Sequence, residues 1–93
     1  MNVGILQLDL KIGDALNLKE KGRIVKSLKD RWRHHHNVSV AEVDFLDHPQ
    51  HAMLGVVMAG SDVRHLESSL SRIVEQVRHD RVAELLDYQI EIL

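Results

Sequence analysis

Cysteine is absent from this chain, and proline, phenylalanine, tyrosine and tryptophan each occur once. The absence of cysteine excludes disulfides and thiolate chemistry and is compatible with a reducing cytoplasm. No run of about 18 apolar residues is present, so we expect no membrane-spanning helix. The first residues carry neither the basic start nor the long apolar run of a secretion signal. Together, these absences predict a cytoplasmic protein.

The 93 residues suffice for one domain, which we place at 1–93. Apolar residues make up 44% of the chain and charged residues 28%, as is usual for globular proteins. A domain of this size buries only about 60–65% of the surface of its unfolded chain. We therefore expect a modest core, supplemented where necessary by a dimer interface.

Hydrophobic periodicity divides the chain into six elements. In the first, Leu6, Leu8 and Leu10 alternate with polar neighbours, which is typical of a half-buried strand. The segment 52–59 has no polar side chain, which indicates a strand covered on both faces. The full prediction, in chain order, is strand 2–12, helix 18–34, strand 38–46, strand 52–59, helix 63–78 and strand 84–93.

This order of elements, β-α-β-β-α-β, predicts an α+β ferredoxin-like fold with a four-stranded antiparallel sheet. Right-handed crossovers place both helices on one face of that sheet. The first and third strands are then central, and the second and fourth strands are edges. Acidic residues in the predicted edge strands fit this arrangement, because charges there discourage unwanted pairing.

The helix predicted at 18–34 has one basic side, and Asn17 and Glu20 form a variant of the capping box at its start. The cations opposite its apolar positions are Lys19, Arg23, Lys26, Lys29 and Arg33. The segment 11–36 holds eight Lys/Arg against three Asp/Glu. This pattern allows either a solvated helix face that balances acids elsewhere or a surface for RNA phosphates. Five phosphate contacts would give a log–log slope of affinity against salt of about −3.5 to −4.5.

Two histidine-rich stretches invite a metal interpretation. The weak candidate ligands are His34, His35, His36, Asp47, His48 and His51. The first three are consecutive at a helix end, so their side chains point about 100° apart and do not converge. The other three surround a predicted turn, where a polar hairpin loop is the default and an acid–base or metal site is the alternative. We therefore predict no metal site and no cofactor.

Two helices can cover only one face of a four-stranded sheet, so part of the apolar strand 52–59 is left on an open face. The side chains expected to form an interface there are Val3, Ile5, Met53 and Val57. Because an exposed apolar patch of several such side chains usually marks an interface, we predict a homodimer through this face. A base-stacking sheet surface is not expected, since none of the three aromatic residues lies in a predicted central strand.

Several segments resemble those of a known family. They are LNLKEKGRIVKSLKDRWR at 16–33, NVSVAEVD at 37–44, and the spaced residues Asp47, Gln50, Ala52, Leu54 and Gly55. With the opening strand and the closing IEIL, they resemble the YlxP-like family of small bacterial proteins, domain of unknown function 503. The resemblance implies a ferredoxin-like fold and no established activity. Since members are commonly encoded among translation-initiation and ribosome-maturation genes, it also implies an RNA or ribosome connection by association.

The chain departs from this family at two places. Gly22 stands where an arginine is usual, which weakens the basic side of the helix. The turn reads His48-Pro49 where an aromatic residue is often found, which argues against a function centred on the turn.

Three functions remain open at this point. The leading hypothesis is a non-enzymatic accessory protein that binds RNA or the ribosome through the basic helix face. The alternative is a dimeric small-ligand-binding or adaptor module, which is an analogy at the level of the fold. The third is an enzyme that uses Asp47, His48 or His51. No nucleophile motif, phosphate loop or dinucleotide fingerprint is present, so catalysis is the least favoured.

Overall fold

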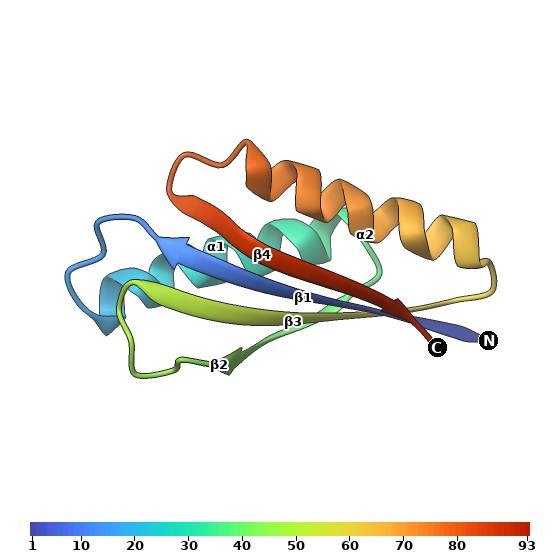
Figure 1. The fold of residues 1–93 in the computed structure, drawn as a ribbon, viewed down its shortest axis with the longest axis horizontal. Coiled ribbons are helices and arrows are strands. Elements are labelled where there is room, and N and C mark those ends of the chain that lie inside the picture. The colour runs from blue at the N-terminus through green and yellow to red at the C-terminus, as the bar shows by residue number, and fades with distance from the viewer.

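The computed structural model describes residues 1–93 and confirms the predicted α+β, ferredoxin-like fold. The elements are β1 (Asn2–Ile12), α1 (Leu18–His35), β2 (Ser39–Asp44), β3 (His51–Gly60), α2 (Val63–Arg78) and β4 (Ala83–Ile92). The strands form one antiparallel sheet in the order β2-β3-β1-β4, with both helices on one face (Figure 1). As predicted, β1 and β3 are therefore central. Neither helix is long and apolar enough to cross a membrane.

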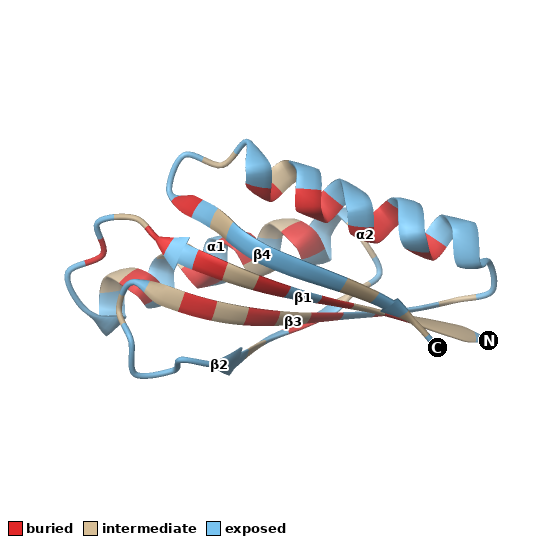
Figure 2. Cartoon of the chain, in the orientation of Figure 1, coloured by how far each residue is buried: buried red, intermediate tan, exposed pale blue.

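The core lies between the sheet and the two helices. Alternate residues of the central strands face the helices, and Leu6, Leu8, Leu54 and Val56 are fully buried there. Trp32 of α1 is buried against them. Figure 2 shows the buried positions alternating along β1 and β3 and lining one side of each helix. Because a buried Leu contributes about 1.5–3 kcal/mol, a one-residue slip that turned these side chains outward would be very costly, which fixes the strand register.

The second strand is shorter than predicted, since β2 ends at Asp44 rather than at residue 46. Its register with β3 shifts between Glu42 and Asp44, and Phe45 follows with φ of 57°. This left-handed conformation is uncommon for a residue other than glycine and ends the strand. The Phe45 ring instead stacks on His51 of β3, with the ring centroids 3.8 Å apart.

The last strand contains a β-bulge. Its pairing with β1 shifts between Asp9 and Leu10, so that Leu10 pairs with Leu85 and Asp9 pairs with Asp87. Leu86 is the extra residue and is 51% exposed. The alternation of side chains between the two faces is therefore interrupted at Leu86, because a bulge changes the direction of the side chains next to it.

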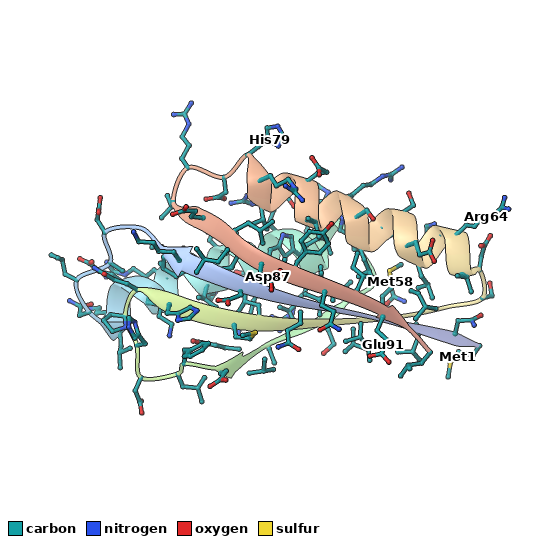
Figure 3. All side chains as sticks on the ribbon, viewed as in Figure 1. Met1, Met58, Arg64, His79, Asp87 and Glu91 are labelled. Carbon is teal, nitrogen blue, oxygen red and sulfur yellow. The ribbon has the colours of Figure 1, made fainter.

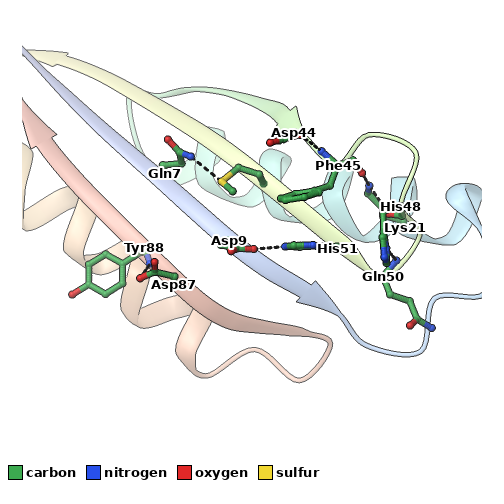
Figure 4. A network of polar contacts seen from close by, with 11 residues as sticks. Gln7, Asp9, Lys21, Asp44, Phe45, His48, Gln50, His51, Asp87 and Tyr88 are labelled. Atoms are coloured by element: carbon green, nitrogen blue, oxygen red, sulfur yellow. Dashed lines mark hydrogen bonds and ion pairs between the residues drawn. The ribbon is translucent and has the colours of Figure 1, made fainter.

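Lys21 is a buried cation of α1, with its side chain only 2% exposed. Its Nζ donates to the carbonyls of Phe45, at 2.8 Å, and His48, at 2.7 Å (Figure 4). The ammonium group also forms an ion pair with the Glu42 carboxylate at 2.6 Å. Helix α1 thus holds the β2–β3 loop, and with it the left-handed backbone at Phe45, in place.

The face of the sheet opposite the helices is open. Val3, Ile5, Met53 and Val57 lie on it, because they alternate with the buried residues of β1 and β3. Val57 is 44% exposed, and the other three are half-buried.

Candidate nucleic-acid interface

Helix α1 turns one side toward the core and the other toward solvent. Its start is capped as predicted, since the side chain of Asn17 accepts the Glu20 N–H at 2.9 Å. Trp32 and Lys21 mark the buried side. Gly22 lies on the exposed side, and a Cβ added to it would meet no atom within 4 Å. No other part of the protein therefore packs against the exposed side of α1 at Gly22, among its basic residues.

The predicted phosphate-binding residues of α1 fall into two groups. Lys19 and Arg23 are exposed and form no salt bridge. Lys26 is also exposed and pairs with Asp30 at 2.7 Å, and this hydrogen bond, with the charges of nearby cations, lowers the pKa of Asp30. Such an exposed pair contributes little to stability. Lys19, Arg23 and Lys26 are thus all available to a phosphate, and we call them the outer cations.

The other two predicted residues lie at the edge of the sheet. Arg33 Nη2 donates to the carbonyl of Val40 in β2 at 3.0 Å, and Lys29 is half-buried. Arg33 therefore ties α1 to the edge strand. All five predicted residues thus reach solvent at least in part, with Lys26 paired to Asp30 and Arg33 bonded to β2.

An interhelical cleft continues from the outer cations. It has a volume of about 690 Å³ and is lined by Arg31, Arg72, Glu75, Gln76, His79, Asp80, Arg81 and Val82. A second hollow of about 210 Å³ shares Arg31, Asp80 and Val82 with it and reaches Arg23. The sequence did not single out Arg31, Arg72 or Arg81 as binding residues, because they come from α1, α2 and the α2–β4 loop. The fold brings them together beside Arg23.

Asp80 positions the α2–β4 loop beside the cleft. Its carboxylate accepts the N–H groups of Val82 at 2.8 Å and Ala83 at 2.9 Å, and it lies 3.4 Å from Arg31. Burial alone would raise the pKa of Asp80, but these two hydrogen bonds and Arg31 outweigh it and hold the pKa below its ordinary value. The contact with Arg31 is long and uses one of five guanidinium donors, so Arg31 retains donors for a ligand.

Positive groups also crowd around the C-terminal end of α1. His36 caps the helix, and its N–H donates to the Trp32 carbonyl at 2.8 Å. Partial burial lowers the pKa of His36, and the charges of His35, Arg72 and His65 lower it further. The local electrostatic potential is therefore positive, and a bound anion would be attracted to this site.

The remaining histidines of this helix end point outward. His34 and His35 are both exposed, and their rings meet edge to face at 4.9 Å. Consecutive helical residues project in different directions. The three neighbouring histidines therefore do not form a common ligand set.

The candidate residues of the β2–β3 turn also lie apart. Asp47 and His48 are exposed in the loop, and the His48 ring is 5.8 Å from that of His51. His51 hydrogen-bonds to Asp9 on the open face of the sheet (Figure 4). No three His, Asp or Glu side chains lie in an arrangement that could hold a metal ion. No pattern in the sequence predicts the stack of Phe45 on His51, because this stack depends on the left-handed backbone that ends β2.

Charge divides between the two layers of the molecule. The helices carry ten Lys/Arg and four Asp/Glu, whereas the strands carry one Lys and six Asp/Glu. In Figure 3, Arg64 and His79 lie at the two ends of α2, and Asp87 and Glu91 lie along β4. The helical layer is therefore the cationic side of the protein, and the sheet is its acidic side.

Known proteins share this fold and give its family. Over 72 residues the chain is 29% identical to the uncharacterized protein YlxP of Bacillus subtilis, covering 77% of this chain and 78% of YlxP. The structure of this chain is similar to that of the structured domain of Drosophila melanogaster Boca, with a TM-score of 0.56. The two are 12% identical, and the match covers 94% of this chain and 95% of the Boca chain. It is also similar to the structural-genomics protein YJCS, with a TM-score of 0.57 and 13% identity over 96% of each chain. The DUF503 model, described as a protein of unknown function, matches residues 3–90, and the chain belongs to the DUF503 family.

Proposed function

We propose that this protein is a non-enzymatic accessory protein of the cytoplasm that binds RNA, free or within the ribosome, through its helical layer. The observation that carries this proposal is the division of charge, with ten Lys/Arg on the helices and one on the strands. A surface that binds a phosphate backbone needs cations gathered on one side of the molecule.

The outer cations and the interhelical cleft together form one binding surface. Arg23 lines the second hollow together with Arg31, and Arg31 also lines the cleft together with Arg72 and Arg81. Arginine suits this role because its planar guanidinium binds phosphate oxygens in pairs. Phosphate contacts position a protein on RNA without reading its sequence. We therefore expect binding with little sequence preference.

The test compares two variants that lower the net charge equally. Lys19→Gln, Arg23→Gln and Lys26→Gln together remove three positive charges from the helical layer. The control, Lys11→Glu with Leu86→Glu, also lowers the charge by three, but at exposed positions on the strands. Fluorescence anisotropy with a labelled 20-nucleotide RNA of mixed sequence measures affinity across a salt series. Co-sedimentation with Bacillus subtilis ribosomes is the second measurement.

The helix variant is expected to bind at least about tenfold more weakly, and its salt slope should be shallower by about 2–2.7, which corresponds to three lost phosphate contacts. The strand variant should stay close to wild type in both measurements. Equal losses in the two variants would show that net charge alone governs binding. Unchanged binding by the helix variant would reject the helical layer as the interface.

A further inference from the structure

The open face of the sheet is organised in rows that cross all four strands. The central row consists of Ala41 in β2, Gly55 in β3, Gln7 in β1 and Gln89 in β4. The adjacent row consists of Ser39, Val57, Ile5 and Glu91. Each row is therefore neutral at the β2 edge and polar or acidic at the β4 edge.

The middle of this face is apolar. Val57 is 44% exposed and Val43 is 55% exposed, beside the half-buried Ile5 and Val3. At Gly55 the place of a side chain is taken by Val43, whose Cγ1 lies 3.1 Å from where a Cβ would be, so Val43 adds its apolar surface to the centre of the face. An apolar surface bounded by polar residues in this way marks a contact with another macromolecule.

The charges on this face are mostly negative, with Lys11 as the one Lys or Arg, and they disfavour RNA as the occupant. Glu84, Asp87 and Glu91 lie along β4, and Asp9 lies on β1 beside Asp87. These carboxylates repel phosphates, which the cationic helical layer on the other side attracts. The open face therefore needs a partner without a phosphate backbone.

The size of the face fits a second copy of the chain. Four strands of six to eleven residues, rising about 3.3 Å per residue and lying about 4.8 Å apart, span about 600 Å². This is about a tenth of the total accessible surface of 5812 Å². Two copies stacked face to face would bury about 1,200 Å², which is the lower end of the range for stable interfaces.

We propose that two copies stack sheet to sheet about a two-fold axis that runs parallel to the strands, between β1 and β3. Rotation about this axis lays each row of one copy over the same row of the other copy, with the strands in the reverse order. As a result, β4 of one copy lies over β2 of the other. Glu91 then lies over Ser39, whose hydroxyl can donate to it. An axis across the strands would instead lay β4 on β4 and bring Glu84, Asp87 and Glu91 of the two copies together, whereas the axis along the strands leaves only the like-charge contact of Asp87 over Asp44.

The same axis brings apolar side chains together in the middle of the interface. In the adjacent row, Val57 of one copy lies over Ile5 of the other. In the central row, Gln7 lies over Gly55, which Val43 of the same copy covers. Because the interface is isologous, each of these contacts occurs twice.

Light scattering on size-exclusion fractions at micromolar concentration tests the dimer. Wild type should elute at twice the monomer mass of 10.7 kDa. Val57→Glu buries a charge at the apolar centre and should weaken the dimer at least about tenfold, as expected for a central interface residue. Val63→Glu is the matched control, because Val63 is 39% exposed at the start of α2, away from the sheet. It should remain dimeric.

Circular dichroism establishes that each variant is folded. If Val57→Glu does not fold, Ala59→Glu replaces it, since Ala59 is exposed on the same face and adjoins Val3. A wild type that remains at 10.7 kDa, or a folded open-face variant that dimerises as wild type does, would overturn the proposal.

Crosslinking tests the direction of the axis. Because the chain has no native cysteine, only the introduced cysteines can react. Stacked sheets lie about 10 Å apart, too far for a direct disulfide, so a short bis-maleimide is used on Ala41→Cys and Gln89→Cys. A mixture of the two variants should give a crosslinked dimer, and each variant alone should give no more than the collision control Ser71→Cys on α2. Self-crosslinking of each single variant, without an additional product in the mixture, would contradict the proposed axis.

Discussion

The helical layer and the open face of the sheet differ in nearly every property that governs recognition. The helical layer is cationic and contains the interhelical cleft, and the arginines that line the cleft come from three separate segments. The sheet face is apolar in the middle and acidic along β4. The difference teaches that one small domain can keep two proposed interfaces apart, because the charge of each layer repels the partner proposed for the other.

The largest effect is expected where a cation of the helical layer serves the fold instead of the surface. Lys21→Met keeps the side-chain length but leaves the carbonyls of Phe45 and His48 without their donor and Glu42 without its partner. Removing one partner of a buried ion pair costs about 3–5 kcal/mol, and we expect the lower end because Glu42 is 20% exposed. Urea unfolding measures the loss as a lower midpoint at an unchanged slope.

Lys19→Met is the matched control for this experiment. Lys19 is an exposed cation two residues earlier on the same helix. Its replacement should change the free energy of unfolding by no more than about 0.5 kcal/mol, while it weakens RNA binding. If both substitutions destabilise the protein equally, the contacts of Lys21 do not hold the loop.

A smaller effect is expected at Gly22, where a substitution separates stability from binding. Gly22→Arg and Gly22→Glu both replace a mid-helix glycine in open space, so each should stabilise the protein by about 0.5–1 kcal/mol. Their effects on affinity for the labelled RNA should have opposite signs, tighter for arginine and weaker for glutamate. A shift in the same direction for both would show that helix stability, and not charge, controls binding.

The smallest effect concerns pH. Partial burial and neighbouring cations keep the pKa of His36 below its ordinary 6.5. The unfolded chain therefore binds more protons than the folded chain just below pH 6.5, and the free energy of unfolding falls as the pH drops through this range. Bound phosphates favour the protonated ring, so RNA affinity should rise over the same range. Thermal melts and anisotropy at pH 7.5 and 6.0 measure both trends.

His36→Gln should flatten both trends, and His34→Gln is the control. His34 is an exposed histidine at the same end of α1. A pH response that survives His36→Gln unchanged would place the titrating group elsewhere.

The fold followed from periodicity, because strand alternation and helix caps are local properties of the sequence. The apolar run 52–59 also predicted which strand is central. The cleft arginines could not be predicted, because Arg31 and Arg72 become neighbours only when α2 packs beside α1. The position of Lys21 in the apolar sector of its helix was an available signal for its burial.

The sidedness of the fold has a consequence for how a pair of molecules would engage RNA. Both helices lie on one face of the sheet, so stacking two open faces turns the two helical layers outward in opposite directions (Figure 1). With layers about 10 Å apart, the two outer surfaces are separated by roughly 40 Å. One short RNA cannot reach both. Such a pair would act as a bridge, bringing two RNA segments together, and its avidity would depend on their spacing.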